Sequence, residues 1–390
     1  MYPHQLERLT GVLDQAGLEA LVASTPANIA YLTGFRSLTQ EIYLTRQTAV
    51  FTRRGTALVV PAVDLASIVL DGVEVDHVGC YGGFIAGHAE PPSEATARIR
   101  ALAGAKAPSP AHALAAALEA LGVAGGRVGF DEGLVTPQAW QRFLERLKPR
   151  ELLPAADHFL EARRVKGPFE IESIARALHV AEEALNAVIQ MLKPGVTERE
   201  AALVYAQEAQ KRGGRPYGVM VAMGERTAQP TPYPSDRALR PGDLVRLDAG
   251  AVFRGYHGEV ARTAVMGAPT AGQGAAHDAL QAGLEAAIAV VKPGAPAARV
   301  HQTAVAAIQA AGLPTFTRYH LGHGIGLEPY ERPKLAGDIT TPLEAGEVLR
   351  VETPHYQHGG TGLNAKDTVL VTTAGATVLN RSARGLVVLD

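Results

Sequence analysis

The spacing of hydrophobic residues divides the first part of the chain into helical and strand-like segments. Residues 4–17 carry apolar side chains at a helical spacing, and Gly17 is placed to end that helix. Ala20–Ala23 is uniformly apolar and predicts a buried strand. Further along, the pattern predicts a β-hairpin of strands 48–51 and 56–60, helices at 111–121 and 136–147, and a strand at 127–130. This alternation of helices and strands is typical of an α/β domain.

A different pattern begins after residue 160. A short basic link, 162–168, precedes a long helical pattern at 169–192. Thr197 followed by Glu200 predicts a capping box at the start of the next helix. The rest of the chain predicts strands at 219–223, 243–248, 259–266, 347–352 and 368–372, with helices at 271–291 and 298–311. We therefore expect two domains, residues 1–160 and 161–390.

Composition supports this division and excludes several classes of protein. A chain of 390 residues is long for one domain of roughly 100–200 residues. With 37 Lys and Arg against 39 Asp and Glu, the net charge of −2 gives no reason to expect nucleic acid or a membrane surface as partner. Cys80 is the only cysteine, so an intrachain disulfide and a cysteine-based metal site are excluded. The N-terminus lacks a signal-peptide pattern and no apolar run could cross a bilayer, so we expect a cytoplasmic protein.

The residues with candidate chemistry gather in five segments of the C-terminal half: Val245–Gly250, Gly255–Thr263, His320–Glu328, Val351–Pro354 and Ala365–Thr372. Asp248 and Glu259 are 11 positions apart, and a glycine-containing connection between them would let two neighbouring strands face each other. Together with His323 and Glu352 they form a set of oxygen and nitrogen donors that suits Zn²⁺, Mn²⁺ or Co²⁺.

These five segments, in this order, resemble the pita-bread-fold family of aminopeptidase P, prolidase, methionine aminopeptidase and creatinase. In the N-terminal half, residues 26–35 resemble the creatinase-type N-domain signature, and 163–172 resemble the usual entry into the catalytic domain. The resemblance implies a two-domain α/β protein, with a creatinase-like N-terminal α/β domain before a pita-bread α+β catalytic domain. It also implies a homodimer.

The resemblance further implies a metal site, but this chain departs from the family pattern. The metallopeptidases of the family hold two metal ions with two Asp, one His and two Glu side chains. Asp248, His323 and Glu352 match three of these ligands, while Glu259 stands at the second Asp position. Lys366 stands where a bridging Glu is expected. At two further positions, the family's histidines are replaced by Thr231 and Tyr330.

Lys366 bears most directly on the metal content. An ammonium about 4 Å from a divalent ion is repelled by roughly 8 kcal/mol at an effective dielectric constant of about 20, so a two-metal cluster is not expected. Three outcomes stay open: Lys366 replaces one metal, it acts as a neutral base, or the site is metal-free as in creatinase. We expect the first, with one divalent ion, most plausibly Zn²⁺ rather than Mn²⁺ or Co²⁺, on Glu259, His323 and Glu352.

Strand alternation gives a hypothesis about the substrate. Side chains at i and i+2 share one face of a strand, so Arg246 points with Asp248, Arg350 with Glu352, and Asn364 with Lys366. Arginine suits a carboxylate, so we expect Arg246 and Arg350, with Thr231, to bind a dipeptide, an N-acyl amino acid or a peptide C-terminus. The alternative is that the two arginines only neutralise the carboxylates beside them.

The favoured function is a metal-dependent exopeptidase that hydrolyses an amide bond of small peptides. By resemblance Glu352 is both ligand and general base, and Lys366 and Tyr330 would stabilise the oxyanion. The losses at Thr231 and Tyr330 weigh against strict Xaa-Pro specificity. One alternative is a metal-independent hydrolase of C–N bonds, for which only His320 is near enough in sequence to be the base. The other is an inactive pseudo-peptidase that binds another protein.

Overall fold

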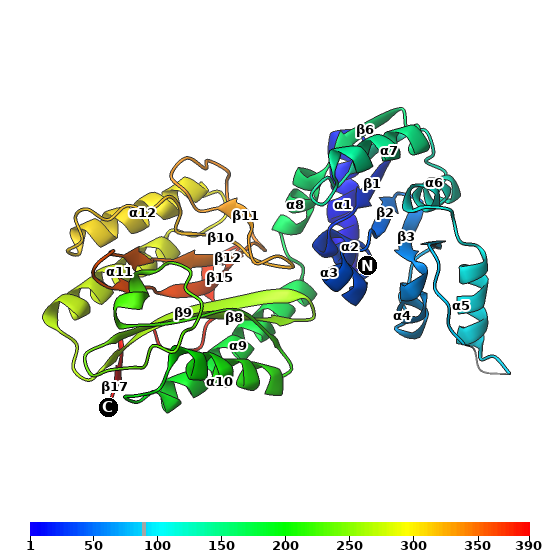
Figure 1. Cartoon of the computed structure of the whole chain (residues 1–390). Helices are drawn as coiled ribbons and strands as arrows, with labels where there is room; N and C mark the ends of the chain where they lie inside the picture. The colour runs from blue at the N-terminus through cyan, green and yellow to red at the C-terminus, as the bar shows by residue number, and fades with distance from the viewer. Residues whose placement is uncertain (88–90) are drawn as a thin grey trace. The chain divides into compact units, whose positions relative to one another are not determined.

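The computed structural model describes residues 1–87 and 91–390, which form two compact units, Met1–Arg163 and Arg164–Asp390. Figure 1 traces both units along the chain. The sequence placed the boundary after residue 160, which lies inside the helix Ala156–Arg164 (α8). No helix within the two described ranges is long and apolar enough to span a bilayer.

The first unit is built on a mixed six-stranded sheet in the order β4-β3-β2-β1-β5-β6. Its strands are β1 (Ala20–Ala23), β2 (Thr48–Thr52), β3 (Gly55–Pro61), β4 (His77–Tyr81), β5 (Arg127–Phe130) and β6 (Glu151–Pro154). Its helices are α1 (Pro3–Ala16), α2 (Pro26–Thr33), α3 (Leu38–Tyr43), α4 (Leu65–Leu70), α5 (Glu94–Gly104), α6 (Pro110–Ala120), α7 (Pro137–Leu147) and α8. The α/β character expected for this half is confirmed.

Local signals account for the elements that the sequence predicted in this unit. Gly17 ends α1 in the left-handed conformation, at φ 61°, which glycine adopts without steric cost. The predicted hairpin joins β2 and β3 in antiparallel register. Strands β4 and β6 and helices α2 to α5 and α8 were not predicted. Of these, α2, α3 and α4 have eight, six and six residues, too few to show a clear hydrophobic period.

The second unit is built on a nine-stranded sheet whose main path is β11-β10-β12-β15-β9-β8-β7, with β16 and β17 attached to β15 and β9. The strands are β7 (Arg215–Met223), β8 (Leu244–Phe253), β9 (Tyr256–Met266), β10 (Gly322–Gly324), β11 (Glu331–Lys334), β12 (Val348–Glu352), β15 (Lys366–Thr372), β16 (Gly375–Val378) and β17 (Val387–Leu389). A separate ribbon pairs β13 (His355–Tyr356) with β14 (Gly362–Leu363). The helices are α9 (Pro168–Met191), α10 (Glu198–Lys211), α11 (Ala271–Ala289) and α12 (Ala297–Ala310).

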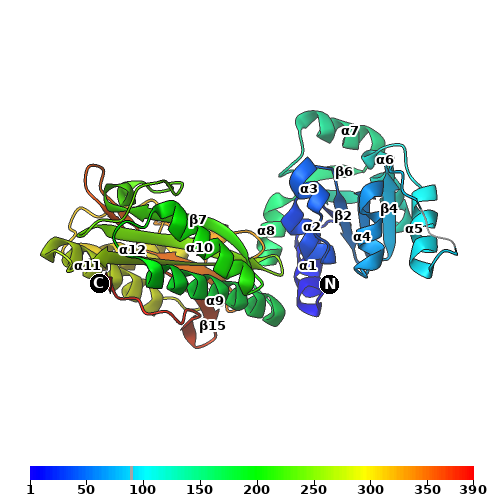
Figure 2. The same cartoon turned by 60° about the horizontal axis from the view of Figure 1, so that its bottom comes forward.

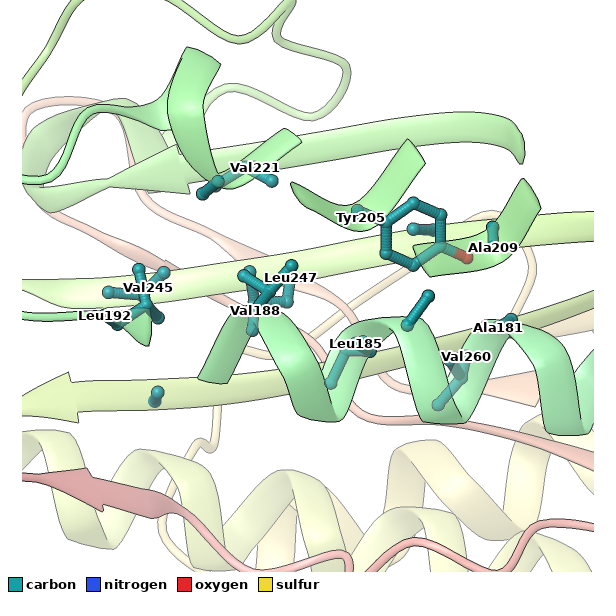
Figure 3. Packing of buried hydrophobic residues seen from close by; sticks show 14 of the residues in the cluster. Ala181, Leu185, Val188, Leu192, Tyr205, Ala209, Val221, Val245, Leu247 and Val260 are labelled. Carbon is teal, nitrogen blue, oxygen red and sulfur yellow. The ribbon is translucent and has the colours of Figure 1, made fainter. Parts of the chain in front are cut away.

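Helices α9 and α10 pack along β7, β8 and β9 (Figure 1 and Figure 2). Figure 3 shows the contact, where Val188 of α9 lies beside Leu247 of β8, and Leu192, which follows α9, lies beside Val245. Val245 and Leu247 are two positions apart, so their side chains lie on the same face of β8, the face that packs against the helices. The alternate side chains of the strand lie on the opposite face of the sheet.

Helices α11 and α12 pack in the same way on the other half of the sheet. Leu349 and Val351 of β12 and Val369 and Val371 of β15 join the apolar cluster of these helices. Alternation therefore turns the intervening positions of β12 and β15 away from α11 and α12. The face of the sheet that carries Asp248, Glu259, Glu352 and Lys366 is called the site face below.

The basic link differs from a simple exposed connection. Arg164 and Lys166 are buried, and each binds a carboxylate of the second unit. Arg164 lies 2.8 Å from Glu347, and Lys166 lies 3.0 Å from Glu331. Their charges therefore hold the start of α9 against distant parts of the same unit rather than lying in solvent.

The close packing of α9 on β9 makes a stability prediction. A Cβ at Gly258 would clash with the backbone nitrogen of Leu178, so Gly258→Ala should lower the free energy of unfolding by about 2–3 kcal/mol. Gly274→Ala in α11 is the matched control, since its Cβ would meet nothing within 4 Å and should raise stability by about 0.5–1 kcal/mol. Urea unfolding of both variants is the measurement. Equal effects would mean that α9 does not press on β9 at Gly258.

Candidate active site

The hairpin of β8 and β9 brings Asp248 and Glu259 onto the site face. Its two-residue turn has positive φ at both Arg254 (52°) and Gly255 (88°), the conformation that suits the twist of paired strands. The register sets Glu259 opposite Gly250 and Asp248 opposite Ala261. A Cβ at Gly250 would lie 2.8 Å from Cγ of Glu259, so the glycine leaves room for the longer carboxylate.

Strands β10, β12 and β15 add the remaining groups. Glu352 stands directly opposite Lys366, and Lys366 stands opposite Ala261 of β9. On the other side of β12, Arg350 stands opposite His323 of β10. Directly opposite residues of neighbouring strands share a face, so all these side chains converge on the site face. The predicted pairing of Arg350 with Glu352 on one face is confirmed.

The Lys366 ammonium lies among three carboxylates. Its Nζ is 2.6 Å from Asp248 Oδ1, 3.2 Å from Glu259 Oε2 and 3.7 Å from Glu352 Oε2. Burial and the nearby Arg350 act to lower the pKa of Lys366, but the three carboxylates outweigh them and raise it. The three carboxylates thus favour the protonated ammonium, which argues against the alternative of a neutral lysine base. Asp248, Glu259 and Glu352 are called the carboxylate cluster below.

Arg350 is the second cation of the carboxylate cluster. Its guanidinium forks between Glu259 and Glu352, with Nη2 3.2 Å from Glu352 Oε1. Burial acts to raise the pKa of Glu352, but Arg350 and Lys366 outweigh it and hold that pKa at about 2. The same two cations outweigh burial at Glu259 and lower its pKa. Glu259 and Glu352 are thus ionised near pH 7, and Arg350 pairs with both of them.

His323 presents a free nitrogen to the site. Its Nδ1 lies 2.8 Å from the carbonyl oxygen of Gly324, which can only accept, so Nδ1 carries the proton. Burial, and after it Arg350, lower the pKa of His323 to about 3, so the ring is neutral near pH 7. Its Nε2 is buried and has no hydrogen-bond partner among the described residues. The ring of Tyr330 stacks on the imidazole with a centroid distance of 3.7 Å.

These observations decide how far the residues fit a divalent metal. The free Nε2 of neutral His323 beside ionised carboxylates is the donor chemistry that zinc prefers. Against this, Lys366 and Arg350 contact all three carboxylates, and within residues 1–87 and 91–390 no three His, Cys, Asp or Glu side chains are disposed to hold an ion. The residues do not fit two metals, and they fit one only if the Arg350 guanidinium leaves the carboxylates.

Arg246 does not neutralise Asp248, although the two side chains share the site face as expected. Asp248 Oδ2 instead accepts a hydrogen bond of 2.9 Å from Asn364 Nδ2. The Arg246 guanidinium donates to the carbonyl oxygens of Gln229 and Pro230 and, at 3.3 Å, to the hydroxyl of Tyr356. It is thus held among neutral acceptors.

Two neighbours of this site, Arg318 and Tyr356, were not predicted from the sequence. Arg318 lies in the irregular segment before β10, and Tyr356 lies in the two-residue strand β13. Neither segment has a hydrophobic period, and only their nearness in sequence to His320 and Glu352 could have drawn attention to them. Thr231, in contrast, is exposed on the connection that precedes β8.

Two protein-family models match this chain. The model of metallopeptidase family M24 matches residues 172–373, and that of the creatinase/prolidase N-terminal domain matches residues 5–165. The chain belongs to metallopeptidase family M24. The two-domain pita-bread architecture and the peptidase class of hydrolase expected from the motifs are confirmed. Membership implies use of a divalent metal ion.

Relatives and solved structures agree with this assignment. An uncharacterised peptidase of Bacillus subtilis, YqhT, is 25% identical over 99% of this chain and 100% of its own length. An Xaa-Pro dipeptidase of Pyrococcus furiosus is 30% identical over 65% of this chain and 74% of its own. The structure of an Xaa-Pro dipeptidase from Bacillus anthracis superposes with a TM-score of 0.83 at 22% identity, covering 99% of each chain, which shows the common fold.

The M24 site of this chain makes a second stability prediction. Lys366→Met removes the ammonium and leaves the carboxylate cluster with Arg350 alone, so the free energy of unfolding should fall by about 3–5 kcal/mol. Lys211→Met, which removes an exposed lysine paired with Glu208, should change it by less than about 0.5 kcal/mol. Thermal or urea unfolding at neutral pH measures both. A loss below 1 kcal/mol for Lys366→Met would show that Lys366 is not the main counter-charge.

Proposed function

We propose that this M24 member is an exopeptidase that hydrolyses an amide bond of small peptides or N-acyl amino acids. The observation that carries the proposal is the convergence of three carboxyl groups and the Nε2 atom of His323, which has no hydrogen-bond partner among the described residues, on one sheet face. Relatives named Xaa-Pro dipeptidases support a substrate of dipeptide size. Thr231 and Tyr330 replace family histidines, so we propose a specificity that is not restricted to Xaa-Pro bonds.

One divalent ion, with Zn²⁺ first and Mn²⁺ or Co²⁺ as alternatives, is part of the proposal. Glu259, His323 and Glu352 would hold it, and the Lys366 ammonium takes the place of a second ion beside Asp248. When bound, such an ion supplies a water of lowered pKa and polarises a carbonyl group. Its binding requires the Arg350 guanidinium to leave Glu259 and Glu352.

The protein's own groups then have separate tasks. Glu352 accepts a proton from the attacking water. The Lys366 ammonium and the Tyr330 hydroxyl donate hydrogen bonds to the oxyanion that develops on the scissile carbonyl. Asn364 holds Asp248 in place for its contact with Lys366.

A metal-independent hydrolase of C–N bonds is the second candidate, and the occupation of the carboxylate cluster by two cations favours it. His320 would be its base. Burial lowers the pKa of this histidine, so its ring is neutral, and it lies edge-on to Tyr330 at 5.8 Å between centroids. We also propose that the protein is a homodimer and lies in the cytoplasm.

Metal content tests the proposal. Mass spectrometry of protein purified without chelator should find about one divalent ion per chain, because a second is repelled by roughly 8 kcal/mol at 4 Å from Lys366. His323→Ala should reduce the content to background, and Glu285→Gln, an exposed helix residue, should leave it unchanged. About two ions per chain would contradict the role given to Lys366.

Activity on the same samples separates the two candidate functions. We expect hydrolysis of a panel of dipeptides and N-acyl amino acids, with a loss of at least about 100-fold in kcat for Glu352→Gln because the amide cannot accept the proton. Circular dichroism of the variant checks that it remains folded. Hydrolysis by protein that holds no metal even after addition of Zn²⁺ or Mn²⁺ would favour the His320 mechanism. No metal and no hydrolysis would contradict both.

A further inference from the structure

A second group of positive charges lies beside the carboxylate cluster. The guanidinium groups of Arg246 and Arg318 both lie over the ring of Tyr356, with Cζ at 5.0 and 5.2 Å from its centroid. The three residues come from β8, the segment before β10, and β13, so the fold has assembled them from separate parts of the unit. Stacking on an aromatic ring leaves the in-plane N–H groups of an arginine free for hydrogen bonds. In Arg246 the two Nη atoms donate to Gln229, Pro230 and Tyr356, and Nε has no hydrogen-bond partner among the described residues.

These two arginines lack the counter-ions that the other site cations have. Arg246 is 1% exposed and Arg318 is partly buried, and the Nε of each is buried with no hydrogen-bond partner. Across the part of the chain that the structure describes, neither guanidinium is within 4.0 Å of a carboxylate oxygen. Burying a cation without a counter-charge is unfavourable unless an anion completes the site. The arrangement is thus suited to an anionic ligand.

The anion would lie next to the reacting groups. Arg246 precedes Asp248 by two positions on the same strand face, which places their Cα atoms about 7 Å apart. Tyr356, whose ring both arginines contact, is half-buried, and the charges of Asp248 and Glu352 act on its hydroxyl. One amino-acid residue spans about 3.8 Å between successive Cα atoms, so the scissile bond and a carboxylate one residue away can occupy both sites together.

The neighbouring charges select the kind of anion. The carboxylate cluster repels negative charge, and this repulsion is about twice as large for a dianion such as phosphate as for a carboxylate. The planar guanidinium groups of Arg246 and Arg318 also suit the two oxygens of a carboxylate. Arg350 is not available for this role because Glu259 and Glu352 already bind it.

We propose that Arg246 and Arg318 bind the free α-carboxylate of the substrate, so that the enzyme releases the C-terminal residue of a dipeptide or peptide. This proposal rests on the proposed peptidase function for the identity of the reaction. The site reads the C-terminus by its charge, and Tyr356 holds the two guanidinium groups in position. Of the two arginines that the sequence suggested, Arg246 keeps the role of anchor and Arg318 takes the place of Arg350.

Binding of small probes tests the anion site without any need for turnover. Isothermal titration should detect N-acetylglycine, which carries the carboxylate, and should find N-acetylglycinamide at least about 10-fold weaker, as expected for loss of a charge-assisted hydrogen bond. Inorganic phosphate should also bind more weakly than N-acetylglycine. Equal binding of acid and amide, or tighter binding of phosphate, would overturn the proposal.

Variants connect the binding to the two arginines. Arg246→Met and Arg318→Met should each weaken binding of N-acetylglycine by about 10-fold or more, and Arg246→Lys should give an intermediate loss because it keeps the charge without the fork. Arg299→Met, at an exposed position of α12, is the matched control and should bind normally. Arg318→Met keeps the test informative if Arg246→Met fails to fold. Normal binding by a folded Arg318→Met variant would overturn the two-arginine site.

Turnover distinguishes this proposal from the proposed function. Wild-type protein should cleave a dipeptide with a free C-terminus with a kcat/KM at least about 10-fold above that of the same dipeptide amide, and Arg318→Met should remove the preference through KM. Carboxylate binding without hydrolysis of either peptide would support the anion site and contradict the peptidase. Hydrolysis with no preference for the acid would support the peptidase and overturn the anion site.

Discussion

Three carboxylates buried on one sheet face need positive charge within a few ångströms, and the second unit is arranged around that need. Lys366 supplies a positive charge from β15, where the strand register places it directly opposite Glu352 of β12. Arg350 supplies a second positive charge from β12 itself, two positions before Glu352. Because these contacts join β8, β9, β12 and β15, the charges also fix how the two halves of the sheet meet.

The cations of the site divide into two kinds with different consequences. The positive charges of Lys366 and Arg350 are largely offset by the carboxylates that they contact. Arg246 and Arg318 touch only neutral acceptors or an aromatic face, so their field stays available. Attack on a carbonyl and recognition of an anion can therefore take place side by side on one sheet face.

The sequence predicted the face on which the site residues lie better than the partners that they choose. Period-two alternation placed Arg246 with Asp248 and Arg350 with Glu352, and the structure agrees. It could not say that Arg350 turns to the carboxylates while Arg246 turns away, because that depends on side-chain rotamers and on loops that supply carbonyl groups. Arg318 escaped prediction for a related reason, since it lies in a segment without hydrophobic periodicity.

The register of Lys366 opposite Glu352 has a consequence for how such a site could arise by mutation. Lysine and glutamate codons differ by a single base, so the family's bridging carboxylate and this ammonium are one mutational step apart. That step reverses the charge at a position buried to 1% exposure, and it would leave four carboxylates facing Arg350. An intermediate with four carboxylates around Arg350 alone would carry an excess of buried negative charge and be unstable, so without a metal ion both Lys366 and Arg350 are needed. We therefore expect that lineages inherit positions 350 and 366 together, as a pair under joint selection.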